Sequence, residues 1–267
     1  MKFANGHIKT AIELVSEERF AQFRHICNSD ENAVILHQHS TMLSAGLMPV
    51  IGLIEIALRN SADLHLTNYF GREDWMTAPA IPFRWKGDEN GRITKAKLMA
   101  QRAIYSKMTN LEKHSLDALA FPNGVRKNQS HSVNAKKRQA QIVPSKGKII
   151  AQLTIYFWKR LFSYDYDSTL WRPALKKVFP QKSIGRADVA QHLENIYQMR
   201  NRVAHHEVIF PDRVGPVLEA VDFVSNNLGV DAPSDDTPLS HLVRPHREIL
   251  DERLDQMKKF ILQVKKA

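Results

Sequence analysis

The chain has 267 residues, 43% of them hydrophobic, and carries a formal net charge of +10. It is long enough for one large domain, or for a domain with an appendage, and can bury a full core. A charge of this size concerns partners rather than the fold and indicates a polyanion, RNA first. Cys27 is the only cysteine, which excludes an intrachain disulfide and a multi-cysteine zinc site. The start MKFANGHIKT lacks an apolar core and no run approaches 18 apolar residues, so we expect a cytoplasmic protein with no membrane partner.

Apolar residues recur at spacings of three and four through most of the chain, and no region shows the alternation that is typical of strands. We therefore predict an all-α protein, a helical bundle. A loop rich in turn residues should occupy 71–91, with its tryptophans Trp75 and Trp85 at a core edge rather than stacked on bases. The expected helices cover 8–26 (one or two short ones, with a turn near Ser16-Glu17), 31–70 (a break near 46–49 is left open), 92–119, 148–161, 164–179, 184 to just beyond the histidines at 205–206, 211–228 and 245–265.

The segment 121–148 differs in composition from the rest of the chain, because it is basic and holds no acidic residue. We expect a long mobile loop whose cations bind the RNA backbone, or, as the alternative, a solvated linker. The candidate RNA-binding residues are Arg126, Lys127, Lys136, Lys137 and Arg138. The predicted organisation is a helical domain over 1–228 that contains this loop. It is followed over 229–267 by a linker and a C-terminal helix, which packs on the domain or on a partner.

The most informative stretch is YQMRNRVAHHEVIF, from Tyr197 to Phe210. The apolar stripe of this helix continues inward at Arg200, and a buried arginine needs a partner or an anionic ligand. Asn201 and His205 are four residues apart and share one face. His205 lies roughly 140° around the axis and about 7.5 Å along it from Arg200, within reach of one common ligand. Pro211 should end the helix, so its dipole would favour protonated histidine here.

Metal-free RNA cleavage needs a base for the 2′-hydroxyl, an acid for the leaving 5′-oxygen and a cation for the charge on phosphorus. Histidine suits the first two tasks and arginine the third. The alternative is structural: an arginine paired with Glu194 or Glu207 beside solvated histidines. A metal phosphoesterase built on His205, His206 and Glu207 is a weaker hypothesis, because adjacent helical residues point about 100° apart.

The segment RNRVAHHE resembles the R-N-x-x-x-H segment of HEPN ribonuclease domains, and specifically that of the Abi-like (abortive infection) family. Two further stretches carry this resemblance, the aromatic run from Leu153 to Pro180 and the helix from Leu53 to Gly71. The aromatic run departs from the family at Ile155-Tyr156, where a glycine is usual. The resemblance implies supporting roles for Glu55, Arg59 and Asn60; the alternative is a solvated helix face with an Arg–Glu pair.

The resemblance implies a HEPN-type helical bundle and a metal-independent endoribonuclease of the phage-defence or toxin type. Its products would carry 2′,3′-cyclic phosphate and 5′-hydroxyl ends. Arg200 would bind the scissile phosphate, Asn201 would orient the groups, and His205 would act as acid or base. His206 would be a second acid or base, or a packing residue. No cofactor or metal is expected, the protein would form a homodimer with a composite active site, and an antitoxin or phage-derived trigger would regulate it. The alternative function is a non-catalytic RNA-binding or protein-interaction module.

Overall fold

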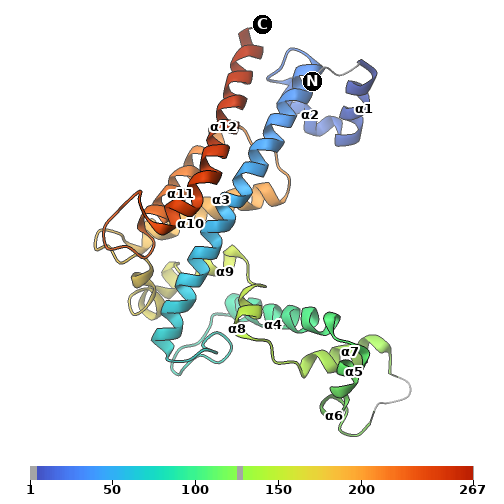
Figure 1. Cartoon of the computed structure of the whole chain (residues 1–267), viewed down its shortest axis with the longest axis vertical. Helices are drawn as coiled ribbons and strands as arrows, with labels where there is room; N and C mark the ends of the chain where they lie inside the picture. The colour runs from blue at the N-terminus through green and yellow to red at the C-terminus, as the bar shows by residue number, and fades with distance from the viewer. Residues whose placement is uncertain (1–4, 125–128, 267) are drawn as a thin grey trace. The chain divides into compact units, whose positions relative to one another are not determined.

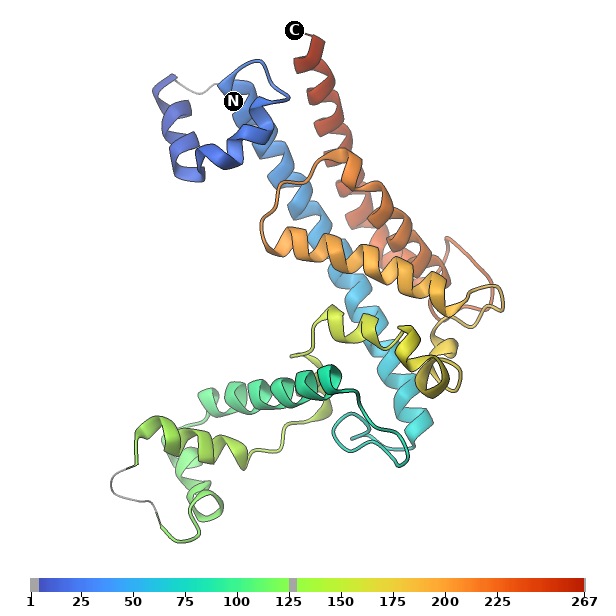
Figure 2. The same ribbon diagram turned by 180° about the vertical axis from the view of Figure 1, so that it is seen from behind.

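The protein is all-helical wherever its structure is described, which is over residues 5–124 and 129–266 of this computed structural model, and no strand occurs there. The all-α prediction is therefore confirmed. The chain divides into two compact units, Met1–Ser61 with Lys176–Ala267, and Ala62–Leu175. Figures 1 and 2 show their helices from opposite sides. We expected a domain over 1–228 followed by an appendage, whereas the structure groups the C-terminal segment with the N-terminal residues.

The unit formed by the two ends of the chain contains the candidate active site. Its apolar core is contributed mainly by one long helix and the three helices that close the chain, with α10 on α11 and α11 on α12. Its elements are α1 (Asn5–Val15), α2 (Glu17–Arg24), the part of α3 (Asp30–Phe70) up to Ser61, α10 (Arg186–Ala204), the short turn η4 (Pro211–Arg213), α11 (Gly215–Asn227) and α12 (Pro238–Lys266).

The C-terminal helix packs on this unit, which decides between the two alternatives left open by the sequence. Leu250 and Met257 of α12 are fully buried. The helix runs beside α3 in both views, and a Cβ added at Gly46 would lie 3.3 Å from Leu250 Cδ1. Arg247 also bonds Asp222 of α11 at 2.6 Å. Glycine at position 46 therefore permits the close approach of the two helices.

The short N-terminal helices agree with the sequence. The predicted turn at Ser16 separates α1 from α2, and the Ser16 hydroxyl accepts a hydrogen bond from the backbone N–H of Arg19 at 3.3 Å. In this N-cap a side-chain oxygen satisfies a free donor of the first turn, although Ser16 has an unusual positive φ of 103°.

Helix α3 is continuous, so the break that we left open near 46–49 does not occur. Pro49 lies inside the helix, where a proline costs about 3 kcal/mol in an isolated helix because it removes a hydrogen bond. The flanking Leu47, Val50 and Ile51 are buried. Packing of this apolar face outweighs the local preference for a break.

Helix α12 begins at Pro238 rather than at Pro245. Thr237 and Ser240 cap one another at its start: the Thr237 hydroxyl accepts from the N–H of Ser240 at 3.0 Å, and the Ser240 hydroxyl accepts from the N–H of Thr237 at 2.9 Å. These bonds satisfy free donors of the first turn, as in a capping box. The helix therefore begins earlier than predicted, directly after the linker.

The unit Ala62–Leu175 departs most from the predicted helix boundaries. The helix expected over 92–119 begins earlier and is divided, and the two expected over 148–161 and 164–179 form several short turns. The elements are the end of α3, α4 (Gly87–Lys107), α5 (Asn110–Ser115), α6 (Asp117–Ala120), α7 (His131–Ala140), α8 (Lys146–Ile150), α9 (Ile155–Arg160), η1 (Tyr164–Tyr166) and η2 (Asp167–Trp171); η3 (Leu175–Val178) spans the boundary.

An aromatic core explains why this second unit is built from short pieces. Trp75 is fully buried and donates its Nε1–H to Asp63 at 2.8 Å, and Trp85 donates to the carbonyl of Met76 at 2.8 Å. Glu89 is also fully buried and accepts hydrogen bonds from Arg160 at 2.8 Å and Tyr166 at 2.9 Å. Both tryptophans thus serve packing, as predicted, and these specific polar contacts override the helical periodicity of the sequence.

Candidate active site

The candidate motif lies at the C-terminal end of α10. The buried face of this helix is formed by Val189, Leu193, Ile196, Met199 and Val203. Arg200 and Asn201 lie at the edge of that face, and both are half-buried. The sequence predicted Arg200 on the buried stripe, and the structure instead leaves it partly accessible to a ligand.

Helix α10 ends before the histidines, which corrects the expectation that Pro211 ends it. His205 is the C-cap, and His206 adopts a left-handed conformation with φ 54°. The N–H of His206 donates to the carbonyl of Val203 at 3.1 Å, and the N–H of Glu207 donates to that of Arg202 at 2.9 Å. These two bonds define a Schellman motif, which stops the helix at once. Pro211 begins η4 instead.

Both histidines are exposed, and neither imidazole forms a hydrogen bond within the described part of the chain. The side chain of Asn201 likewise has no hydrogen-bond partner there. All three groups are therefore free to meet a ligand.

Arg200 forms no ion pair with any described residue, and the structure shows why. Glu207 is paired with Arg202, with 3.1 Å between Arg202 Nη1 and Glu207 Oε2. Glu194 accepts a hydrogen bond from Gln198 at 2.6 Å. The structural alternative, in which Arg200 pairs with Glu194 or Glu207, is therefore wrong for this arginine and correct for its neighbour Arg202.

A pocket of about 290 Å³ opens next to the Schellman motif. Arg19, His37 and His206 line it, together with Glu207 and three hydroxyl-bearing residues of α3. Arg200, Asn201 and His205 are not among its lining residues. The structure thus brings His206 to residues far away in the sequence, whereas Arg200 and His205 lie outside this pocket.

Sequence reasoning missed Arg19 and His37 as neighbours of the motif. The link between these distant segments is Ser40, whose buried hydroxyl donates to the carbonyl of Ile209 and accepts from its N–H, both at 3.1 Å. No local spacing could reveal a contact across 169 positions. Burial first, and then the nearby Arg19 guanidinium, lowers the pKa of His37 below its ordinary value. Arg19 itself forms no ion pair among the described residues.

The proposed supporting residues lie on α3. Glu55 and Arg59 are half-buried and Asn60 is exposed. Arg59 Nε is buried and has no hydrogen-bond partner in the structure as described. A buried polar atom without a partner is uncommon and calls for an explanation, such as an unobserved water or ligand. Arg59 is therefore not fully solvated, whereas Asn60 fits the solvated-face alternative.

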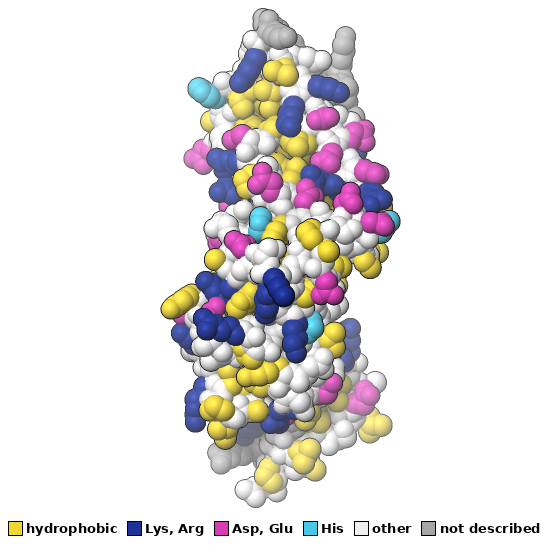
Figure 3. Space-filling model, turned by 90° about the vertical axis from the view of Figure 1, so that its left-hand side faces the viewer, with side chains coloured by type: hydrophobic (Ala, Val, Ile, Leu, Met, Phe, Trp, Pro, Cys, Tyr) yellow, Lys and Arg dark blue, Asp and Glu magenta, His cyan; other side chains and the backbone are white. Residues whose placement is uncertain are grey.

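The basic segment contains a helix where we predicted a loop. Lys136 and Lys137 are exposed on α7, whereas Arg138 donates to Asp117 at 2.5 and 3.0 Å and is largely buried against Phe121. Arg138 therefore has a structural role, which corrects its prediction as a residue that binds RNA. Arg126 and Lys127 lie outside the described residues. On the face drawn in Figure 3, basic side chains are interspersed with acidic ones and do not form one continuous patch.

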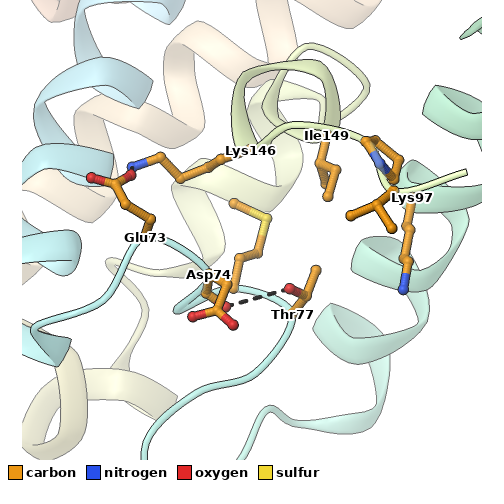
Figure 4. A pocket seen from close by; sticks show the side chains of 9 residues that line it. Glu73, Asp74, Thr77, Lys97, Lys146 and Ile149 are labelled. Atoms are coloured by element: carbon orange, nitrogen blue, oxygen red, sulfur yellow. Dashed lines mark hydrogen bonds and ion pairs between the residues drawn. The ribbon is translucent and has the colours of Figure 1, made fainter.

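A second pocket, of about 260 Å³, lies within the unit Ala62–Leu175 (Figure 4). Lys146 lines it and points toward Glu73, from which it is separated by 2.5 Å, and it also bonds Asp63 at 2.9 Å. Two carboxylates therefore compensate this lysine, which disfavours an anionic ligand. Across the described ranges, no three His, Cys, Asp or Glu side chains are grouped as metal ligands, including His205, His206 and Glu207.

Helix α3 is long and apolar enough to cross a membrane by length and composition, although a third of its most apolar window is buried inside the protein. Core helices of soluble proteins pass the same test. The sequence matches no protein-family model, and neither a curated protein nor a solved structure matches it.

Proposed function

We propose that the protein is a metal-independent endoribonuclease. The observation that carries this proposal is Arg200, a half-buried arginine with no carboxylate partner among the described residues, one turn before two histidines whose imidazoles are also unpaired. A guanidinium in this situation is suited to a phosphate, which its planar fork matches. The net charge of +10 favours RNA as the source of that phosphate.

In the proposed reaction the 2′-oxygen attacks phosphorus and the 5′-oxygen leaves. A histidine accepts the proton of the 2′-hydroxyl, and a protonated histidine gives a proton to the 5′-oxygen. Arg200 stabilises the charge that develops on the phosphoryl oxygens, and Asn201 orients the phosphate or a histidine. The products are a 2′,3′-cyclic phosphate and a 5′-hydroxyl. His205 supplies one of the two acid–base groups, and a second molecule supplies the other in a homodimer with a composite site.

The resemblance of RNRVAHHE to the Abi-like HEPN segment supports this proposal, as does the all-α architecture. In this proposal the protein acts in cytoplasmic phage defence, under the control of an antitoxin or a phage-derived trigger. In this proposal Glu55 and Arg59 hold the motif from α3, and the buried, unpartnered Nε of Arg59 is available for that purpose.

The test is cleavage of end-labelled RNA in EDTA by the wild type and by the Arg200→Ala, His205→Ala and Arg202→Ala variants. We expect cleavage that persists in chelator, is lost in the first two variants, and is retained in Arg202→Ala. Arg202 is the matched control, because it lies on the same helix and its charge is already paired with Glu207. The new 5′ ends should accept a labelled phosphate from a kinase without prior phosphatase treatment. Equal cleavage by all four proteins would refute the proposal.

The second candidate is a non-catalytic RNA-binding or protein-interaction module. Its supporting observation is that Lys136 and Lys137 are exposed on α7, while neither motif histidine is oriented by a described side chain. Salt-sensitive RNA binding without cleavage would establish this alternative.

A further inference from the structure

The pocket beside the Schellman motif combines cationic and hydroxyl groups from three separate segments. Arg19 comes from α2, and His37, Ser40, Thr41 and Ser44 come from α3. His206 comes from the turn after α10. The Ser40 hydroxyl is already engaged with Ile209, and that of Thr41 donates to the carbonyl of His37 at 3.0 Å. The groups left for a ligand are therefore the guanidinium, the two imidazoles and the Ser44 hydroxyl.

Arg19 has a positive charge that no described carboxylate compensates. It is half-buried and forms no ion pair, although carboxylates are close by in the sequence and in the pocket. Glu17 is bound to Arg24, and Glu207 is bound to Arg202. Those carboxylates thus have arginine partners other than Arg19. A partly buried guanidinium without a partner is suited to an anion from solution.

His206 occupies a backbone position that favours glycine. It is the first residue beyond the C-cap in the Schellman motif, with φ 54°, where a Cβ is unfavourable. Backbone strain of this kind persists where the surrounding structure or a functional need maintains it. Its imidazole has no described hydrogen-bond partner and lines the pocket. The position thus holds a histidine although glycine would fit the turn better.

We propose that this pocket binds a phosphate group, held by Arg19 and His206, with His37 as a further hydrogen-bonding group. The guanidinium supplies a planar fork of donors, and the imidazoles supply donors from another side. The attribution of this phosphate to RNA rests on the proposed function, whereas phosphate binding itself does not. In RNA it would be a phosphate next to the one cleaved, or a terminal phosphate. Arg200 and His205 then act on the scissile group, and His206 binds its neighbour.

The experiment follows the imidazole signals of the full chain by NMR during titration with inorganic phosphate. We expect saturable shifts of the His37 and His206 signals, and an upward shift of the His37 pKa as phosphate compensates the charge of Arg19. Arg19→Gln and His206→Gly should each weaken binding at least about tenfold, by the loss of one charge-assisted contact. His131→Ala is the control, because this exposed histidine of α7 lies outside both proposed phosphate sites, and it should bind as the wild type does. Arg19→Gln breaks no described ion pair and glycine suits φ 54°, so both variants should fold.

Absence of saturable shifts in the wild type would overturn the proposal, as would unchanged binding by Arg19→Gln. Two arms use 2′-O-methyl oligonucleotides, which cannot be cleaved through the 2′-oxygen. Preference for a 5′-phosphorylated oligonucleotide over its 5′-hydroxyl form assigns a terminal phosphate to the pocket, and equal affinity assigns an internal one. Phosphate binding in a protein that cleaves no RNA would refute the endoribonuclease and leave the pocket standing. Normal RNA cleavage by a protein that binds no phosphate would refute the phosphate pocket and leave the endoribonuclease standing.

Discussion

Replacement of His206 by glycine should stabilise the protein while it impairs phosphate binding. Left-handed backbone costs a residue with a Cβ about 1–2 kcal/mol, and glycine loses about 0.5–1 kcal/mol more than other residues through unfolded-state entropy. The exposed imidazole makes no described hydrogen bond, so its removal forfeits little. The expected net gain is about 0.5–1 kcal/mol. For a protein of this size, that gain corresponds to a rise in Tm of about 1–4 °C.

The assay is thermal unfolding followed by circular dichroism, with His205→Gly as the matched control. His205 has φ −92°, which any residue adopts, so glycine there should lower stability by about 0.5–1 kcal/mol. The two adjacent substitutions should therefore change Tm in opposite directions. A decrease in Tm for His206→Gly comparable with that of the control would refute the strained-histidine argument.

The remaining predictions concern packing, titration and charge. Gly46→Val should destabilise the protein by about 1–3 kcal/mol through overpacking against α12, whereas Gly52→Val on the same helix, where an added Cβ meets nothing within 4 Å, should be near neutral in urea unfolding. Burial lowers the pKa of His192, so the unfolded state binds a proton at this residue more readily than the folded state does. The free energy of unfolding should therefore fall as pH decreases below about 6.5, and it should fall less steeply in His192→Leu. The same dependence of the free energy of unfolding on pH in both proteins would count against this. If the exposed Lys136 and Lys137 contact RNA phosphates, replacing both by alanine should weaken RNA binding. The slope of the logarithm of the binding constant against the logarithm of the salt concentration should become smaller by about 1.4. An unaltered slope would show that the two lysines do not contact the RNA.

The sequence predicted the helical class and the turn at Ser16, because periodicity and capping act locally. It also predicted the extent of α3, but left open whether the helix continues through Pro49. There the buried neighbours along the helix outweigh the cost of proline. The early start of α12 at Pro238 was missed for a related reason, since the cap between Thr237 and Ser240 resembles a loop in sequence.

The candidate site was only partly accessible from sequence. Spacing along α10 predicted Arg200 and Asn201 on the helix, and the structure leaves both half-buried without a described polar partner. Spacing could not show that Arg202 takes Glu207, because both arginines lie within reach of a carboxylate. That His206 and Arg19 line one pocket depends on a tertiary contact between distant segments. Arg138 was misjudged because the sequence does not reveal its bond to Asp117.

The bond between Ser40 and Ile209 has a consequence for any ligand at the Schellman motif. The motif fixes the backbone at His206, and the Ser40 hydroxyl fixes it again at both polar groups of Ile209. Only Glu207 and Val208 lie between these anchors. The segment is therefore preorganised, and a bound phosphate would not have to order it first. In flexible sites, ordering a loop on binding costs about 0.5–1.5 kcal/mol for each side chain that is immobilised. We expect this cost to be small here.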